Sequence, residues 1–127
     1  MMGSLLPEGR PISPDIRENI AAIRAMAGDS MDIVIREFKL GNGQDAVSFY
    51  IDGMVNKEYL GREFYAPLLH AGERREWRVE DLAQQVLSMG ETSSYLDLDQ
   101  LIAAVYQGLT ALFVAGDTQA LCVEAIS

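Results

Sequence analysis

Cysteine, histidine and long apolar runs are all scarce in this chain of 127 residues. The single cysteine, Cys122, cannot form a disulfide within the chain, which excludes a fold held together by disulfides. The single histidine, His70, leaves too few ligands for an ordinary zinc cluster, because such clusters draw several Cys or His side chains together. The longest uncharged stretch contains residues 101–116 and is still shorter than the about 20 apolar residues that cross a bilayer. The sequence therefore predicts a soluble chain.

Positive charge is also in short supply. Lys and Arg number 10 against 19 Asp and Glu, so the formal net charge is −9. An acidic surface repels the phosphates of nucleic acids and of anionic lipids, so neither is an expected partner. Three arginines around Trp77 form a local exception, but glutamates interrupt them, which favours a solvated charged segment over a phosphate site. These residues are Arg74, Arg75 and Arg78, with Glu73, Glu76 and Glu80.

The domain organisation follows from length and periodicity. No basic start followed by a long apolar run occurs in residues 1–14, so no signal peptide is predicted. Residues 1–12 contain Gly and Pro without periodicity and are expected to form a flexible leader. Residues 13–127 fit one domain, since a single core commonly serves about 100–200 residues. The chain ends directly after a predicted strand, which favours a domain cut from a longer polypeptide.

Four segments carry apolar residues at the spacing of a helix. They span residues 13–28, 56–72, 79–89 and 97–108. Ser13 and Asn56 are the expected N-caps of the first two, and Asp97 with Gln100 resembles a capping box for the fourth. Pro67 should kink or shorten the second helix, because it lacks the amide that its turn requires.

Four further segments are predicted strands, at residues 33–40, 46–55, 110–115 and 119–126. Residues 41–44 and 116–117 have turn chemistry, so the strands pair as two antiparallel hairpins. Val47, Phe49 and Ile51 alternate with polar or amphipathic neighbours, and a bend is expected at residues 52–53. The order αββαααββ predicts an α/β (α+β) fold, in which about four helices cover a four-stranded mixed or antiparallel sheet.

Catalytic, metal and cofactor sites are not predicted. Cys122 lies in a predicted strand, where a thiol usually packs as a small hydrophobe, and His70 lacks a partner in the sequence pattern. Glu91, Asp97 and Asp99 offer oxygen ligands for a hard cation, but a helix start explains Asp97 and Asp99 without a metal.

Two hairpin motifs identify a relative. Residues 32–38, Asp-Ile-Val-Ile-Arg-Glu-Phe, and residues 50–55, Tyr-Ile-Asp-Gly-Met-Val, resemble the first hairpin of the spore germination receptor A subunit, the GerA family. The pattern of residues 13–28 and the sequence Leu-Phe-Val at residues 112–114, with Gly116, fit the same N-terminal region. The resemblance covers about residues 13–127.

The resemblance implies a fragment of a larger membrane protein. Such A subunits have a hydrophilic N-terminal region of two subdomains, followed by several transmembrane helices in the spore inner membrane. With B and C subunits they form a receptor that responds to small nutrients and starts ion release. The B subunit is usually regarded as the nutrient binder, and A subunits are thought to assemble into the channel. This chain would be the first subdomain, on the spore core side of the membrane. The family offers no catalytic motif to transfer.

Three functions remain open. The leading hypothesis is a non-enzymatic module for receptor assembly or signal transmission, whose partners are neighbouring A subunits, the second subdomain, and the B and C subunits. Its expected surface anchors are aromatic residues and arginines, although ordinary packing also accounts for the aromatics. These anchors are Arg36, Tyr50, Tyr59, Arg62, Tyr65 and Trp77. The alternative is a germinant-sensing domain with a pocket near Asp52 and Asn56. A third hypothesis, a small hydrolase, requires a cleft that joins His70 to Cys122 or to an acid pair.

Overall fold

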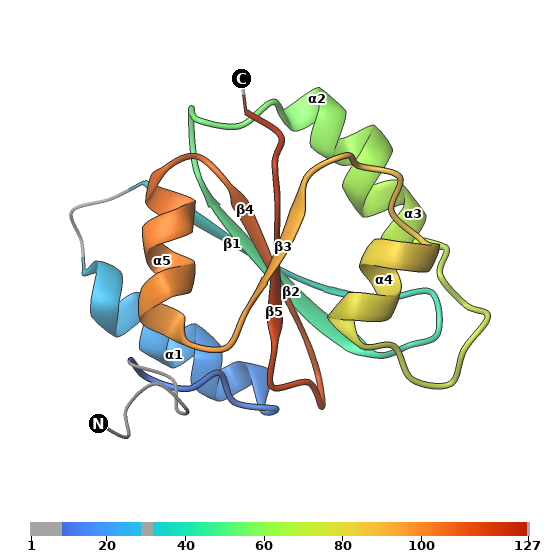
Figure 1. Ribbon diagram of the computed structural model, residues 1–127, viewed down its shortest axis with the longest axis horizontal. Coiled ribbons are helices and arrows are strands. Elements are labelled where there is room, and N and C mark those ends of the chain that lie inside the picture. The colour runs from blue at the N-terminus through green and yellow to red at the C-terminus, as the bar shows by residue number, and fades with distance from the viewer. Residues whose placement is uncertain (1–8, 29–31, 127) are drawn as a thin grey trace, which may run out of the picture.

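The structure is a computed structural model that describes residues 9–28 and 32–126. These residues form an antiparallel five-stranded sheet in the order β1-β2-β4-β5-β3, with helices on both faces (Figure 1). The strands are β1 (Ile33–Lys39), β2 (Asp45–Ile51), β3 (Thr92–Tyr95), β4 (Thr110–Val114) and β5 (Ala120–Val123). The helices are α1 (Ile16–Ala27), α2 (Lys57–Leu60), η2 (Gly61–Tyr65), α3 (Ala66–Leu69), α4 (Val79–Gln85) and α5 (Leu98–Tyr106). Among the described helices, none is long and apolar enough to cross a membrane.

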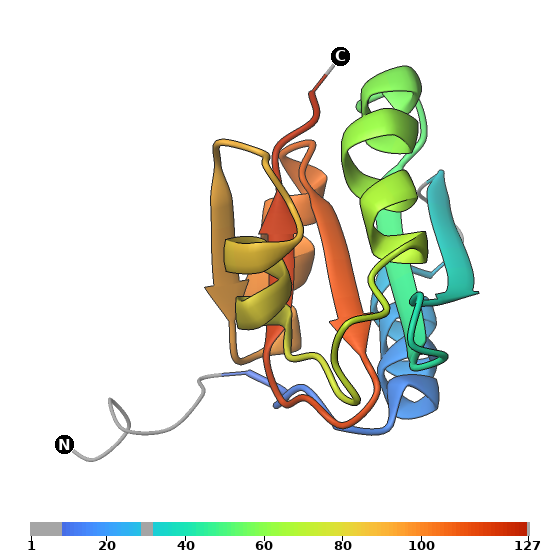
Figure 2. The same cartoon turned by 90° about the vertical axis from the view of Figure 1, so that its right-hand side faces the viewer.

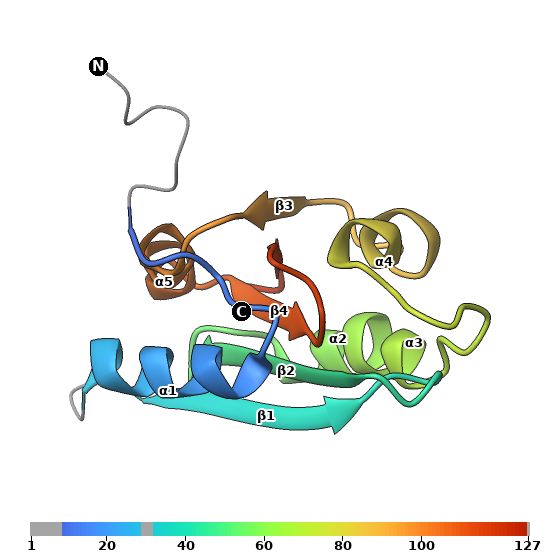
Figure 3. The same ribbon diagram turned by 90° about the horizontal axis from the view of Figure 1, so that it is seen from below.

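The sheet separates two hydrophobic cores. Helices α1 and α5 lie on one face, and α2, η2, α3 and α4 lie on the other (Figure 3). Successive side chains of a strand point to opposite faces, so β2 sends Phe49 into the α1–α5 core and Tyr50 into the α2–α4 core. Strands β4 and β5 are buried throughout, and β2 is buried from Ala46 onward. The alternation predicted for the second strand is therefore present, but both sets of side chains are buried.

The predicted fold class and both antiparallel hairpins are confirmed, but the sheet has five strands where the sequence predicted four. The additional strand is β3, which pairs with β5 at the border of the sheet. Its sequence, Thr-Ser-Ser-Tyr, is short and polar, and its first three residues are exposed. A strand of this kind shows no apolar alternation, because neither of its faces is fully covered.

Two helix boundaries differ from the prediction. The N-cap of α1 is Asp15 rather than Ser13, since the Asp15 carboxylate accepts a hydrogen bond from the Arg17 amide at 3.0 Å. The Ser13 hydroxyl accepts instead from the Asp15 amide, at 3.0 Å, and so orders the approach to the helix. Helix α4 ends at Gln85, short of the predicted residue 89, and the following turn returns Leu87 to the core.

Pro67 alters its helix upstream of its own position. Helices α2 and α3 are continuous through η2, a π-helical turn in which the Ala66 amide donates to the Gly61 carbonyl. A proline ring clashes with the carbonyl four residues earlier in a regular helix, and a wider turn relieves that crowding. The predicted kink is thus a widened turn, and Leu60, Phe64 and Leu68 still face the core.

The β1–β2 turn is joined to the loop before α4. Gln44 accepts a hydrogen bond from the Trp77 amide at 2.8 Å and donates to the Trp77 carbonyl at 2.8 Å and to the Ala115 carbonyl at 3.0 Å. Asp117, in the β4–β5 turn, accepts from the Val79 amide at 2.8 Å and so caps α4 from a distant segment. These side chains fix the loop that carries Trp77.

The N-terminal segment lies against α5 and β3. Ile12 is buried, and its amide donates to the Leu96 carbonyl at 3.1 Å. Leu98 donates to the Arg10 carbonyl at 2.7 Å, and Pro11 pairs with Asp97 as an isolated bridge. The predicted leader, residues 1–12, falls largely on residues 1–8, which lie outside the described residues.

Candidate functional site

Arg36 and Tyr65 connect the border strand β1 to the helix that covers it. The Arg36 guanidinium carbon lies 4.1 Å from the centroid of the Tyr65 ring, within the range of a cation–π interaction. The Tyr65 hydroxyl is 2.6 Å from the Ser48 hydroxyl, and its ring meets Phe38 edge-on at 5.5 Å between centroids. Burial raises the pKa of Tyr65, and the hydrogen bond to Ser48 partly opposes that rise. Arg36 itself is exposed on the strand.

Three of the expected surface anchors are buried. Tyr50, Tyr65 and Trp77 expose 8%, 5% and 2% of their surface, so the prediction that they are exposed is wrong. All three pack in the α2–α4 core, where the Trp77 indole donates to the Ala71 carbonyl at 3.2 Å. The sequence could not show this, because the expected alternation of β2 placed Tyr50 on a polar face that helices in fact cover. Their aromatic rings are therefore used in packing.

Tyr59 and Arg62 form a surface on the α2–η2–α3 helix. Arg62 is exposed and its guanidinium carbon lies 5.8 Å from the centroid of the half-buried Tyr59 ring. The Arg62 Nε donates to a Glu63 carboxylate oxygen at 2.9 Å. Together with Arg36, these are the predicted anchors that remain accessible to a partner.

Asp52 and Asn56, the predicted walls of a ligand pocket, are held by local contacts. The Lys57 ammonium lies 2.7 Å from Asp52 Oδ1, and this hydrogen-bonded ion pair lowers the pKa of Asp52 and raises the pKa of Lys57. Asn56 is the N-cap of α2 and accepts from the Tyr59 amide at 3.0 Å. A cavity of about 380 Å³ adjoins Asn56 and Tyr59, but Asp52 does not line it. Its other lining residues are Gly90, Glu91, Glu124, Ala125 and Ile126.

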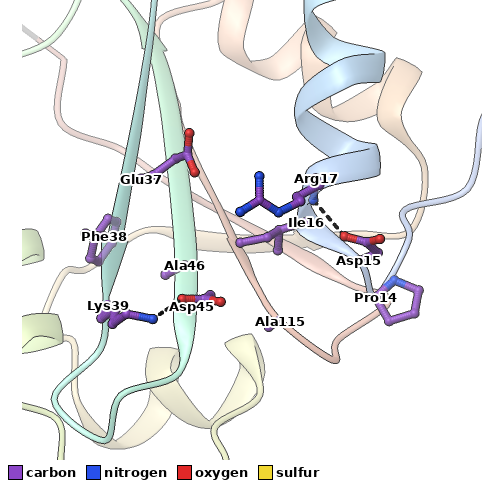
Figure 4. Close-up of a pocket in the computed structure, with 10 residues that line it drawn as sticks. All are labelled: Pro14, Asp15, Ile16, Arg17, Glu37, Phe38, Lys39, Asp45, Ala46 and Ala115. Atoms are coloured by element: carbon purple, nitrogen blue, oxygen red, sulfur yellow. Dashed lines mark hydrogen bonds and ion pairs between the residues drawn. The ribbon is translucent and has the colours of Figure 1, made fainter.

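A second cleft, of about 450 Å³, lies between the start of α1 and the strands β1 and β2 (Figure 4). Sequence reasoning missed it, because its walls come from segments far apart in the chain. Its charged residues carry both signs, and the Lys39 ammonium lies 2.6 Å from Asp45 Oδ1, which lowers the pKa of Asp45. The lining residues are Pro14, Asp15, Ile16, Arg17, Glu37, Phe38, Lys39, Asp45, Ala46 and Ala115.

The arginines near Trp77 do not converge on a common point. Arg74 lies 3.3 Å from an Asp81 carboxylate oxygen, and its guanidinium carbon is 5.2 Å from the centroid of the Trp77 ring. Arg78 lies 3.8 Å from the buried Asp117. Because two of the three arginines have carboxylate neighbours, the segment fits the predicted solvated charged loop.

The hydrolase hypothesis required a cleft that joins His70 to Cys122 or to an acid pair. Cys122 is buried in the α1–α5 core, and burial raises the pKa of its thiol to about 12. His70 follows α3 on the opposite face of the sheet, where its Nδ1 lies 2.8 Å from the Ala66 carbonyl. The structure therefore keeps the two side chains apart and the thiol protonated at neutral pH.

The acidic residues considered as metal ligands have separate structural roles. Asp97 caps α5 by accepting a hydrogen bond from the Gln100 amide at 2.7 Å. This is the role that the predicted capping box gives to Asp97. Asp99 accepts from the Arg10 amide at 2.9 Å, and the Glu91 carbonyl accepts from the Glu124 amide. Within residues 9–28 and 32–126, no group of three or more Asp, Glu, His or Cys side chains is arranged to hold a metal ion.

The fold is that of a known receptor domain. The N-terminal domain of the A subunit of the Bacillus megaterium spore germinant receptor GerK3 matches with a TM-score of 0.77 and 24% sequence identity. The match covers 91% of this chain and 48% of that one. At this identity the likeness establishes the fold, which is the α+β sandwich found in the N-terminal part of that subunit.

Sequence comparison gives the family. The model of the Bacillus/Clostridium GerA spore germination protein family matches residues 21–127, and the chain belongs to this family. The chain is 30% identical over 115 residues to the uncharacterized membrane protein YfkQ of Bacillus subtilis (strain 168), and 28% identical over 114 residues to spore germination protein KA of the same strain. The matches cover 90% and 87% of this chain but only 22% and 21% of those relatives, so the chain spans about a fifth of their length. The resemblance inferred from the two hairpin motifs is confirmed.

Proposed function

We propose that this chain is the first subdomain of the N-terminal region of a germinant receptor A subunit, where it contributes to receptor assembly or to the signal that starts germination. The observation that carries the proposal is the fold shared with the N-terminal domain of the GerK3 A subunit. The parent protein would lie in the spore inner membrane, with the second subdomain and the B and C subunits as partners.

The arrangement of the side chains supports an interaction role over a catalytic one. The buried Asp97 and Asp117 and the half-buried Gln44 are used to fix loops and helix starts. What the domain offers to a partner is a rigid sandwich with Tyr59 and Arg62 on a helix and Arg36 on a border strand. Rigid surfaces with aromatic and arginine side chains are typical of protein interfaces.

The test uses spores that carry the parent subunit with Tyr59→Ala and Arg62→Glu together. We expect slower germination on nutrient addition, measured as the fall in optical density, with the A subunit still present on an immunoblot. Co-purification of the B and C subunits then separates lost assembly from lost signalling. Gln84→Ala, on the exposed side of α4, is the matched control and should germinate normally. Normal germination after removal of residues 13–127 from the parent protein would refute the proposal.

Germinant sensing is the second candidate, and the cavity of about 380 Å³ beside Asn56 and Tyr59 is the observation that favours it. In this case NMR spectra of the chain would show saturable shifts on titration with amino acids or sugars, clustered at Asn56, Tyr59 and Glu124. Spectra that do not change at millimolar ligand would remove this candidate and leave the assembly role in place.

A further inference from the structure

The outer side of β1 has an unpaired backbone. Among the described elements, β1 pairs with β2 alone, and it lies at the opposite border of the sheet from β3 (Figure 2). The Asp32 carbonyl and the Leu40 amide, which bracket the strand, are both hydrogen-bonded across to the β2 side. In an antiparallel pair such bonds alternate along the strand, so even-numbered residues of β1 bond to β2. The amides and carbonyls of Ile33, Ile35 and Glu37 therefore point outward.

The two borders of the sheet are protected to different degrees. At the β3 border, the N-terminal segment covers one end through the bond from the Ile12 amide to the Leu96 carbonyl. β3 is also short, with four residues, whereas β1 has seven. In Figure 3, β1 forms the outer limit of the molecule, with no described element beyond it. Borders of sheets are usually guarded by charge, proline or a bulge, but residues 33–35 are an uncharged β-branched run, Ile-Val-Ile, that is only half-buried.

This part of β1 is complementary to itself. When a second copy runs antiparallel with Val34 opposite Val34, Ile33 comes opposite Ile35 and Asp32 comes opposite Arg36. This register places odd-numbered residues of one copy opposite odd-numbered residues of the other. The outward-pointing amides and carbonyls of Ile33 and Ile35 can then bond to each other across the two copies. A shift of two residues places Arg36 opposite Val34 and loses both Asp32–Arg36 pairs, and a shift of four places Arg36 opposite Arg36, where like charges repel.

The charges at the ends of this segment are available for pairing. Within the described residues, no cationic group lies within ion-pair distance of the Asp32 carboxylate. Arg36 is exposed, with its guanidinium carbon 4.1 Å from the centroid of the Tyr65 ring, and within the described residues no carboxylate lies within ion-pair distance of it. Each copy thus presents one unpaired anion and one accessible cation at the positions where the other copy needs them.

We propose that a second copy of this chain adds to the border of β1 through residues 32–36, so that two five-stranded sheets become one continuous sheet across a two-fold axis at Val34. Backbone hydrogen bonds provide the attraction, and the two Asp32–Arg36 pairs set the register. A five-residue segment buries less than the about 1,200 Å² of a stable complex, so the dimer is weak and forms where copies are held close together. This inference rests on the proposed assembly role, and it names a second copy of the chain as one of the partners.

Disulfide trapping tests the register. In this arrangement Val34 faces its own copy across a non-hydrogen-bonded pair, with Cα atoms about 4.5–5.5 Å apart, which suits a disulfide. Val34→Cys should therefore give a covalent dimer under mild oxidation, while the buried Cys122 stays unreactive. Arg36→Cys and Glu37→Cys are the matched controls, because neither residue faces its own equivalent in the other copy. We expect their yield to be at least about fivefold lower, and equal yields at the three positions, or none, would overturn the proposal.

A charge exchange tests the ion pairs without relying on one substitution. Asp32→Arg and Arg36→Asp should each weaken dimerisation by about tenfold, as measured by sedimentation up to millimolar protein. The double variant Asp32→Arg/Arg36→Asp restores both pairs between copies and should return the dissociation constant to within about threefold of the original. Damage to folding cannot produce that recovery. A chain that stays monomeric at every concentration, or a double variant as weak as the singles, refutes the dimer, while the spore experiment on Tyr59 and Arg62 still decides the proposed function.

Discussion

At the scale of single residues, buried polar side chains carry much of the specificity of this domain. Asn19 is 1% exposed and uses both ends of its amide on Ser13, accepting from the Ser13 amide and donating to the Ser13 carbonyl, each at 2.8 Å. Ser48 and Asp117 are likewise hydrogen-bonded. Among the described residues, the Thr110 hydroxyl is the exception, buried without a partner. An unpaired buried group costs stability, so the other pairs contribute by avoiding that cost.

Because of Cys122, the free energy of unfolding should depend on pH in the alkaline range. Burial raises the pKa of its thiol from 9.0 to about 12 in the folded chain. The folded state therefore holds this proton more strongly than the unfolded state, and the stabilisation is complete below about pH 9 and is lost as the pH rises towards 12. Between these values the free energy of unfolding should fall by up to about 1.4 kcal/mol per pH unit because of this group. Urea unfolding from pH 8.5 to 10.5 should show a steeper fall for the wild type than for Cys122→Ala, and parallel curves would contradict the prediction.

At the scale of elements, the joint between the β1–β2 turn and the Trp77 loop should be a sensitive point. Gln44→Ala removes the partners of the Trp77 amide and carbonyl, and we expect a loss of about 1–3 kcal/mol in unfolding free energy. Trp77 is the single tryptophan of the chain, so its fluorescence should also move to longer wavelength as the loop loosens. Gln84→Ala on α4 removes a glutamine that is exposed and should change neither quantity. A stable Gln44→Ala variant with native fluorescence would show that the backbone alone fixes the loop.

The elements with local signals were the predictable ones. The first helix, both hairpins, the Asn56 cap and the Asp97 cap follow from residues that act on neighbours two to four positions away. β3 escaped prediction because its pairing with β5 depends on residues nearly 30 positions further along the chain. The end of α4 depends likewise on which side chains the sheet can bury. Distant contacts, rather than local propensity, decide these features.

The candidate site was less predictable than the fold, for a related reason. Arg36, Tyr59 and Arg62 are at the surface or partly so, as expected, but Tyr50, Tyr65 and Trp77 are buried. Burial of an aromatic side chain depends on whether a helix covers that face of the sheet, and periodicity within one strand carries no such information. The outward-facing backbone of β1 was equally hidden, since it appears only when the order of the strands is known.

At the scale of the whole molecule, the two cores share one sheet and should unfold together. Neighbouring residues of β2, β4 and β5 enter opposite cores, so neither core can lose its packing while these strands keep theirs. Loss of a methyl group in one core should therefore lower the free energy of unfolding equally, whichever of the two cores is monitored. This coupling is a property of the doubly covered sheet and not of any single contact.

Ile51→Val tests this coupling, because Ile51 lies in the α1–α5 core and Trp77 reports on the α2–α4 core. The substitution should cost about 0.5–1.5 kcal/mol, with the same shift of the urea midpoint in Trp77 fluorescence and in far-ultraviolet circular dichroism. Val114→Ala, in the α2–α4 core, is the reciprocal variant and should likewise shift both signals together. If Ile51→Val moved the circular dichroism transition and left the fluorescence transition unchanged, the two faces would be separate folding units, and a partner at the β1 border could then influence one core without the other.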